Sequence, residues 1–481
     1  MEKRFWKAVL LFGLAFHVIA SFTMPLGLDA TVHASYVSDG MSDGESHLEW
    51  GELRTDSGYE SQPSEVSADG KWFAWHAFVE IIFSVFSISS TSLHIFGLIG
   101  GIGCLVVIYF FTNKLFGESN ALMLTAISSI YPPLIRATGR FYQEGFILIL
   151  ITISCYAIIK TIRGESKIWL LLPVLSAIVI LSFKGMPIWY LLPAGFVLAL
   201  SQRLEMNQIQ MALLAILVEV FILMRNGVSL TTPDIIPALL SSFIAYFLFV
   251  SCGMLLLDKV AGIQNETSIK FDKASRMIAA CLIGWVSALW VTEAVSLNSS
   301  FFDIVYSFRN NPRYLSLLIV PLWYSRMLMS EYKFPVSSKP SNITYVLVFM
   351  LIAINSAVLT TTGQTGVSVI GSHLEGQISD DDDILFISDE PLSMHRLYSL
   401  KFEADPESEI DNNGYWRTTN SGWQIELEEC QELINVEWII YYSDVDYQSP
   451  MGWVETEYDN SNSIDDSYKL FKWGGEDDRC S

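Results

Sequence analysis

Long apolar runs recur along this chain from about residue 8 to residue 360, and they constrain its fold more than any other feature. A helix needs about 20 apolar residues to cross a bilayer, and several of these runs approach that length. The chain of 481 residues is 51% hydrophobic but only 17% charged, which is little charge for a soluble protein of this size. The sequence therefore predicts a polytopic α-helical membrane protein.

We expect about 11 transmembrane helices. They are expected at residues 8–25, 93–112, 119–135, 145–161, 168–183, 186–200, 208–224, 235–257, 277–296, 315–330 and 343–360. Lysine and arginine are more frequent in the loops on the side of the N-terminus, which places that terminus in the cytoplasm of a multi-pass cell-membrane protein. An odd number of spans then places the C-terminal tail outside. The N-terminus could also be read as a signal peptide, but Ala20-Ser21-Phe22 is a poor cleavage site, so we expect an uncleaved first helix.

We divide the chain into a membrane domain, residues 1–360, and a small soluble extracytoplasmic α/β domain, residues 361–481. Within the membrane domain, residues 26–92 are expected to be the first outer loop. Up to residue 70 this loop is rich in Ser, Gly and Asp and partly disordered in composition. Residues 71–90 are aromatic, which favours a helix lying in the membrane interface. The alternative is a twelfth span, which would invert everything downstream.

The tail shows the patterns of a compact α/β module. Short buried strands are expected at 366–370, 383–388 and 436–442, and a helix at 391–401. Most of its tryptophans are expected in the core, with a sugar-stacking surface as the alternative. Cys430 and Cys480 are the cysteines of the polar tail, and an outside location would let them form a disulfide.

The formal net charge of −22 is concentrated in the first outer loop and in the tail. This acidity argues against nucleic acid as a partner, because a nucleic-acid-binding surface needs positive charge. It suits a solvated outer face.

Asp29 and His33 lie directly after the first apolar run, at the membrane surface. They are four residues apart, so they share a face if the segment is helical. An ionisable group at the mouth of a membrane helix is a candidate functional residue. The alternative is that Asp29 is the N-cap of a surface helix and accepts hydrogen bonds from the backbone of its first turn.

Several cationic residues lie near span ends on the expected outer side, against the orientation rule. They are Arg136, Arg140, Lys184, Arg225, Arg309 and Arg313. An anionic partner on that face would explain them, whereas ordinary pairing with the acidic first loop is the alternative. The planar fork of arginine suits phosphate because it makes two parallel charge-assisted hydrogen bonds.

Glu144 follows Arg140 by one helical turn. It could hold that arginine in position, or bind a divalent cation together with Asp29. The alternative is a local ion pair of little energetic weight. Lys184 lies in a tight turn, Ser182 to Pro187, where it could contact a lipid-linked phosphate or extend to the lipid headgroups.

The order of these features resembles the GT-C superfamily of membrane glycosyltransferases, of the protein O-mannosyltransferase and lipid A aminoarabinose transferase type. Residues 72–162 carry most of the resemblance, including HAFVEIIFSVFSIS, LHIFGLIGGIGCLVVIYFF and IYPPLIRATGRFYQEGF. Asp29 matches the acid of the family's first outer loop, and Arg140 with Glu144 matches its arginine-containing second outer loop. The family often has a pair of acids in the first loop, whereas Ala30 follows Asp29 here.

The resemblance implies transfer of a sugar, with inversion, from a polyprenyl- or dolichyl-phosphate-linked donor to a protein or lipid-linked glycan acceptor at the outer face. Asp29, aided by His33, would be the catalytic base. The donor phosphate would be bound by Arg136, Arg140, Lys184, Arg309 and Arg313. Glu144 and His76 would support the site, and a divalent cation, Mg²⁺ or Mn²⁺, could bind Asp29 and Glu144.

Two other functions fit parts of the sequence. A secondary transporter or lipid flippase would need ionisable groups inside the spans, and Glu80 and Glu219 come nearest to that. A non-catalytic surface protein would carry its binding activity in the tail alone. The expected membrane-lipid contact is common to all three functions.

Overall fold

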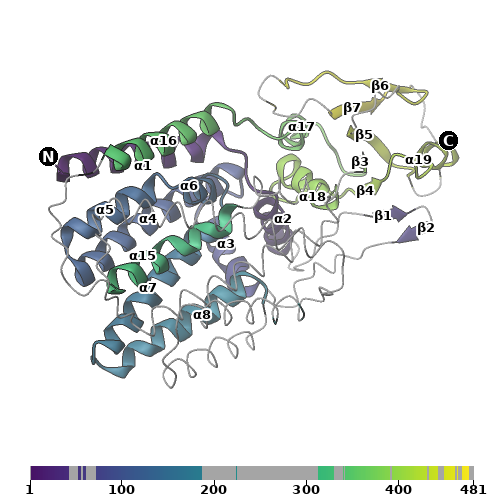
Figure 1. Cartoon of the computed structure of the whole chain (residues 1–481). Coiled ribbons are helices and arrows are strands. Elements are labelled where there is room, and N and C mark those ends of the chain that lie inside the picture. Colours follow the sequence, from purple (N-terminus) through teal and green to yellow (C-terminus); the bar gives the residue numbers. More distant parts are fainter. Residues whose placement is uncertain are drawn as a thin grey trace. The chain divides into compact units, whose positions relative to one another are not determined.

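The computed structural model describes residues 2–42, 52–55, 58–60, 72–186, 221, 224, 312–329, 340, 342–389, 393–430, 433–442, 449–460, 463 and 468–475. The contacts divide the chain into two units (Figure 1). Unit 1 comprises Met1–Ser21 and Gly97–Thr360, and unit 2 comprises Phe22–Phe96 and Thr361–Ser481. Residues 26–92, expected with the membrane domain, thus cluster with the tail.

Apolar helices dominate the described part of unit 1. They are α1 (Glu2–Thr23), α4 (Ser90–Phe116), α5 (Glu118–Ser129), α6 (Pro132–Gly139), α7 (Glu144–Ile162), α8 (Leu171–Phe183), α15 (Ile319–Met329) and α16 (Asn342–Thr360), with the 3-10 helices η1 (Lys167–Leu170) and η4 (Pro312–Leu318). The end of α1 after Ser21 and the start of α4 before Gly97 belong to unit 2. Among the described residues, α1, α4 and α7 are long and apolar enough to cross a membrane. These helices support the prediction of a membrane protein. The spans expected at 186–200, 208–224, 235–257 and 277–296 lie essentially outside the described residues.

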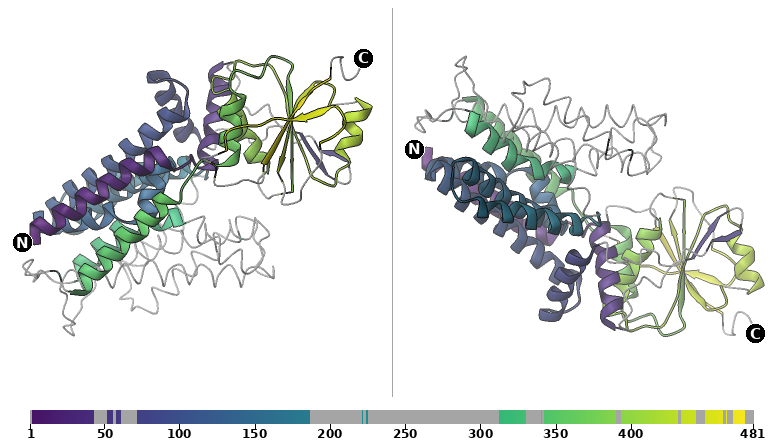
Figure 2. Two further views of the ribbon diagram at one scale, coloured as in Figure 1. Left: turned by 90° about the horizontal axis from the view of Figure 1, so that it is seen from above. Right: turned by 90° about the horizontal axis from the view of Figure 1, so that it is seen from below.

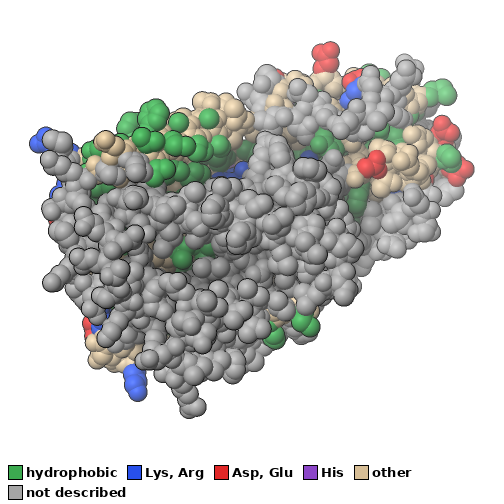
Figure 3. Space-filling view, viewed as in Figure 1, with side chains coloured by type: hydrophobic (Ala, Val, Ile, Leu, Met, Phe, Trp, Pro, Cys, Tyr) green, Lys and Arg blue, Asp and Glu red, His purple; other side chains and the backbone are tan. Residues whose placement is uncertain are grey.

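The outer surface of these helices is apolar. Large hydrophobic side chains of α1, such as Phe12 and Phe22, and of α16, such as Phe349, are 55%, 65% and 71% exposed. Figure 3 shows hydrophobic side chains gathered over the region of α1 and α16. Such a patch on a helix of this composition is the surface expected to face lipid tails.

One expected span is two helices. The run at 119–135 is divided between α5 and α6, with Tyr131 in an extended conformation between them. Pro132 explains the break, because a proline disfavours the helical conformation for the residue before it. The break allows α6 to end at Gly139, where an added Cβ would lie 2.8 Å from the carbonyl oxygen of Ala20 on α1. Close approach of α1 and α6 therefore requires this glycine.

Unit 2 is built on a mixed sheet. Its described strands are β1 (Glu52–Thr55), β2 (Gly58–Glu60), β3 (Asp383–Ser388), β4 (Gly414–Arg417), β5 (Val436–Tyr442), β6 (Trp453–Glu455) and β7 (Tyr468–Trp473). Their order is β2-β1-β4-β3-β5-β7-β6, with β1, β4, β3 and β5 parallel. Every residue of β3 is buried, as befits a central parallel strand.

Helices cover both faces of this sheet (Figure 2). The helices α17 (Gly366–Leu374) and α18 (Ser393–Ala404) lie on one face, and α19 (Trp423–Glu429) lies on the other. Trp423, Trp438 and Trp453 are at most 5% exposed, so the prediction of core tryptophans is confirmed for these three. Cys430 is disulfide-bonded, whereas Cys480, its expected partner, lies outside the described residues.

The segment 366–370, expected as a strand, is instead the start of α17. Thr365 is the N-cap and accepts a hydrogen bond from the backbone N–H of Ser368. Val367, Ile370 and Leu374 are buried, and their spacing is that of one face of a helix. Val367 and Val369 are typical of strands, so the helical spacing was not recognised in the sequence. The strands expected at 383–388 and 436–442 and the helix expected near 391–401 are confirmed as β3, β5 and α18.

The first outer loop also contains two helices, and its composition predicted only the second of them. Residues Leu28–Ser42 form the buried helix α2, which packs on α18. Its buried face consists largely of small residues such as Ala30, Ala34 and Ser38, so it lacks a hydrophobic stripe. The aromatic segment forms α3 (Phe73–Val85), so the helix expected within residues 71–90 is confirmed, and Trp75 and Val79 are buried.

Candidate anion-binding site and the α2 residues

The ends of three helical elements meet in unit 1. Glu144 begins α7, Lys184 follows the last residue of α8, and Arg313 is in η4. The Lys184 ammonium lies 2.5 Å from Glu144 Oε1, and Arg313 Nε lies 4.0 Å from the same oxygen. The three side chains are 1%, 12% and 7% exposed for Glu144, Lys184 and Arg313. A buried carboxylate therefore holds two cations that are far apart in sequence.

Two tyrosines line this group. The Arg313 guanidinium lies 4.5 Å from the ring centroid of Tyr142 and 5.1 Å from that of Tyr314. The Lys184 ammonium lies 5.2 Å from the Tyr314 ring. Cations over aromatic faces are held by the negative face of the ring. The tyrosines thus stabilise the cations without neutralising them.

Two further arginines complete the cluster. Arg140 Nη1 donates a hydrogen bond of 3.3 Å to the Tyr142 hydroxyl. Arg136 lies close enough to Arg140 and Arg313 to be repelled by both, and it also interacts with Tyr142. We call Arg136, Arg140, Glu144, Lys184 and Arg313 the cationic cluster.

The cationic cluster contains four positive groups and one carboxylate. Positive charge in a mostly buried setting is unfavourable unless an anion balances it. The cluster also lies where helices end, so its groups are at the border of the apolar part of unit 1. This arrangement fits an anion such as a phosphate, which arginine binds through its planar fork and lysine binds as a point charge.

The structure gives Glu144 different partners from those expected. Arg140 follows the end of α6 and Glu144 begins α7, so the two residues do not share a helix, and the expected spacing of one helical turn is wrong. Phe141, which lies between them, has a left-handed backbone conformation with φ of 53°. Lys184 is paired with Glu144 rather than extended to headgroups. Arg309 lies outside the described residues. Tyr142 and Tyr314 were missed, although each is within two residues of an arginine.

Asp29 belongs to unit 2 and is exposed in the first turn of α2. The Gly27 carbonyl accepts the first hydrogen bonds of the helix, from Ala30 and Thr31, at 2.8 and 3.1 Å. Gly27 is therefore the N-cap, and the alternative that Asp29 occupies that position is wrong. A carboxylate in the first turn still benefits from the positive end of the helix dipole.

His33 lies one turn further along α2. Its Nδ1 is 2.9 Å from His76 Nε2 on α3, and His76 packs on Tyr36 with ring centroids 4.4 Å apart. Burial, together with the nearby imidazole of His33, lowers the pKa of His76 to about 3. His76 is therefore neutral at physiological pH, and one of the two rings donates a hydrogen bond to the other.

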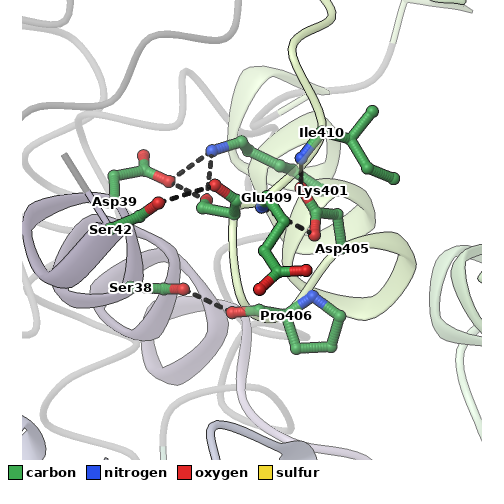
Figure 4. A network of polar contacts seen from close by, with 9 residues as sticks. Ser38, Asp39, Ser42, Lys401, Asp405, Pro406, Glu409 and Ile410 are labelled. Atoms are coloured by element: carbon green, nitrogen blue, oxygen red, sulfur yellow. Dashed lines mark hydrogen bonds and ion pairs between the residues drawn. The ribbon is translucent and has the colours of Figure 1, made fainter. Parts of the chain in front are cut away.

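A second polar network in unit 2 joins α2 to α18 and the segment that follows it (Figure 4). The Lys401 ammonium donates to Asp39 Oδ1 and, at 2.7 Å, to Ser408 Oγ. Ser42 Oγ donates to the Ser408 carbonyl at 2.9 Å, and Ser38 Oγ donates to the carbonyl of Pro406. The contacts of α2 in this network could not be predicted, because their partners are more than 300 residues away in the sequence.

Another α18 residue faces the start of α2. Burial lowers the pKa of His395, and the negative charge of Asp29 opposes that shift. The Asp29 carboxylate therefore interacts electrostatically with the His395 imidazole, and His395 was not among the residues predicted from the sequence.

A divalent cation does not fit the cationic cluster. Glu144 already faces Lys184 and Arg313, and a third cation there would be repelled. In the described part of the chain, no group of three or more His, Cys, Asp or Glu side chains gathers as metal ligands would.

No known protein family and no curated protein matches this chain. Among solved structures, the chain is similar to the crystal structure of ArnT from Cupriavidus metallidurans bound to undecaprenyl phosphate. The identity is 9%, the match covers 97% of each chain, and the TM-score is 0.38. A similarity at that score does not establish a function.

Proposed function

We propose that this protein is an integral-membrane glycosyltransferase that moves a sugar from a polyprenyl-phosphate-linked donor to an acceptor on the outer face, with inversion. The observation that carries the proposal is the cationic cluster of unit 1. Lys184 and Arg313 face one buried carboxylate at the ends of apolar helices, and Arg136 and Arg140 lie beside them at Tyr142. A lipid-linked phosphate has the charge for such a cluster and the apolar chain for the lipid beside it.

The chemistry of transfer explains why more than one cation is useful. The donor is a phosphodiester with one negative charge. When the bond between the anomeric carbon and the phosphate oxygen breaks, the bonding electrons stay with that oxygen, and the leaving group becomes a phosphomonoester with a second negative charge. Lys184, Arg313 and Arg140 would stabilise the charge that develops, which lowers the barrier.

The acceptor needs a base. We propose Asp29 for this role: its carboxylate would take the proton of an acceptor hydroxyl as the oxygen attacks the anomeric carbon. Attack opposite to the leaving phosphate inverts the anomeric configuration. His33, on the same face of α2 as Asp29 and hydrogen-bonded to His76, would position the acceptor. No step requires a metal ion.

The test uses the full chain in lipid nanodiscs, with a radiolabelled polyprenyl-phosphate hexose and the membrane fraction of the source cells as acceptor. Lys184→Met removes one cation and is expected to lower the transfer rate by about 100-fold, the usual effect of removing one group that stabilises charge in a transition state. The matched control is Lys160→Met, because Lys160 is at the other end of α7 and pairs with exposed Glu165.

The rate of the Lys160→Met protein should equal that of the wild type. Asp29→Ala should abolish transfer but leave binding of the lipid phosphate intact. Equal transfer rates for wild type and Lys184→Met would contradict the role of the cationic cluster. Counterflow of a labelled solute through the protein, with no sugar transfer, would contradict the glycosyltransferase proposal and favour a transporter.

A further inference from the structure

The two oxygens of the Glu144 carboxylate have different surroundings. Oε1 faces Lys184 at 2.5 Å and Arg313 at 4.0 Å. Oε2 is buried and has no hydrogen-bond partner in the part of the chain that the structure describes. A buried acceptor without a partner is unfavourable, because it has lost the hydrogen bonds it made with water.

The charge around Glu144 decides what could pair with Oε2. Its cationic neighbours keep the carboxylate ionised, and an ionised carboxylate only accepts hydrogen bonds. A phosphate oxygen is also an acceptor, so it is repelled by Oε2 and drawn to the cations. A ligand held here therefore has to present a hydrogen-bond donor to Oε2 and its phosphate to Lys184 and Arg313.

We infer that Glu144 is a specificity-determining residue that recognises the sugar of the donor lipid: Oε2 accepts a hydrogen bond from a hydroxyl of the sugar carried on the phosphate. This inference rests on the proposed function, because it takes the phosphate of the cluster's ligand to be lipid-linked. It assigns two tasks to one carboxylate. Oε1 pairs with the Lys184 ammonium and keeps it in place to bind the phosphate. Oε2 distinguishes a lipid phosphate that carries a sugar hydroxyl from one that carries none.

The consequence is selectivity that charge alone would not give. A sugar phosphodiester and a simple alkyl phosphodiester have the same charge, so the cations treat them alike. Only the sugar supplies a donor to Oε2. The alkyl ester would leave that oxygen buried and without a partner, which lowers its affinity.

The test compares two lipids on the full chain in nanodiscs: polyprenyl-phosphate hexose and polyprenyl methyl phosphate. The wild type should bind the hexose lipid about tenfold more tightly, as expected for one hydrogen bond to a charged group. Glu144→Gln replaces the charged acceptor with a neutral amide of the same shape, so it should reduce this preference to about twofold or less. Lys160→Met, the matched control, should keep the wild-type preference.

The outcomes separate this inference from the proposed function. Equal binding of both lipids by the wild type overturns the role of Oε2 but leaves the phosphate-binding cluster standing. A preference that persists in Glu144→Gln also overturns it, because another group must then recognise the sugar. Failure of the wild type to bind either lipid would contradict the proposed function itself. The wild-type comparison decides the matter even if the variant does not fold.

Discussion

Glu144 is the residue on which the cationic cluster depends, because it is the negative group that Lys184 and Arg313 face. Its position at the first residue of α7 places the carboxylate at the positive end of the helix dipole. Truncating Glu144 would leave two mostly buried cations without their carboxylate. The effect on stability should therefore exceed that of an exposed ion pair.

This leads to a prediction for a double-mutant cycle. Glu144→Gln alone should lower the free energy of unfolding by roughly 2–4 kcal/mol, because it leaves the Lys184 charge uncompensated. Glu144→Gln combined with Lys184→Met should recover a large part of that loss, because the orphaned charge is removed as well. Thermal unfolding of the purified protein in detergent measures both. Additive losses in the double variant would show that the two side chains do not interact.

At the scale of elements, the packing of α2 on α18 depends on one buried ion pair. Asp39 and Lys401 have side chains that are 3% and 7% exposed. Asp39→Asn should destabilise unit 2 by roughly 3–5 kcal/mol, since the Lys401 charge would stay buried without its partner. Hydrogen exchange of the α2 and α18 amides measures the loss. Unchanged protection in Asp39→Asn, or no recovery when Lys401→Met is added, would contradict this account.

A second element-scale prediction concerns pH. Glu403 on α18 accepts a hydrogen bond of 2.8 Å from the Ser90 hydroxyl. Burial raises the pKa of Glu403 to about 7. The hydrogen bond from Ser90 opposes this shift, and the negative charge of Glu375 adds to it. The folded protein therefore holds this proton more tightly than the unfolded chain does. The stabilisation from Glu403 is fully present below about pH 4.5 and is lost as pH rises through about 7.

Glu403→Gln should remove this dependence, because the amide does not ionise. The difference in melting temperature between variant and wild type should therefore grow in favour of the variant from pH 5 to pH 8. Subtracting the two profiles cancels the contributions of His76 and His395, whose pKa values are lowered and which destabilise the fold only as pH falls. A constant difference across that range would show that Glu403 is ionised throughout.

Part of this arrangement could be predicted from sequence. The described spans are long apolar runs, and their presence was expected from length alone. The helix α2 was missed because Ala34 and Ser38 give a close-packed helix no apolar stripe, and α17 was mistaken for a strand because its valines obscure the helical period. Lys184 and Arg313, which face Glu144, could be selected from the sequence because they lie near span ends on the expected outer side, where lysine and arginine are uncommon. Tyr142 and Tyr314 had no such signal.

At the scale of the whole molecule, the apolar helices and the disulfide at Cys430 bear on orientation. Disulfides persist in oxidising compartments, which supports an outer location for the tail. Met451 is 93% exposed in unit 2, so Met451→Cys offers a reporter for the tail, and Lys3→Cys offers one for the N-terminus. A membrane-impermeant maleimide added to intact cells should label the first and not the second. The reverse pattern would invert the proposed topology.

The central claim is that the cationic cluster binds a lipid-linked phosphate. The most direct measurement is photo-crosslinking of a polyprenyl phosphate that carries a diazirine next to the phosphate, followed by mass spectrometry of the labelled peptides. The account predicts labels on the peptides containing Tyr142, Lys184 or Arg313, lost in Lys184→Met and not competed by unphosphorylated polyprenol. Labels confined to other helices, or equal competition by polyprenol, would contradict it.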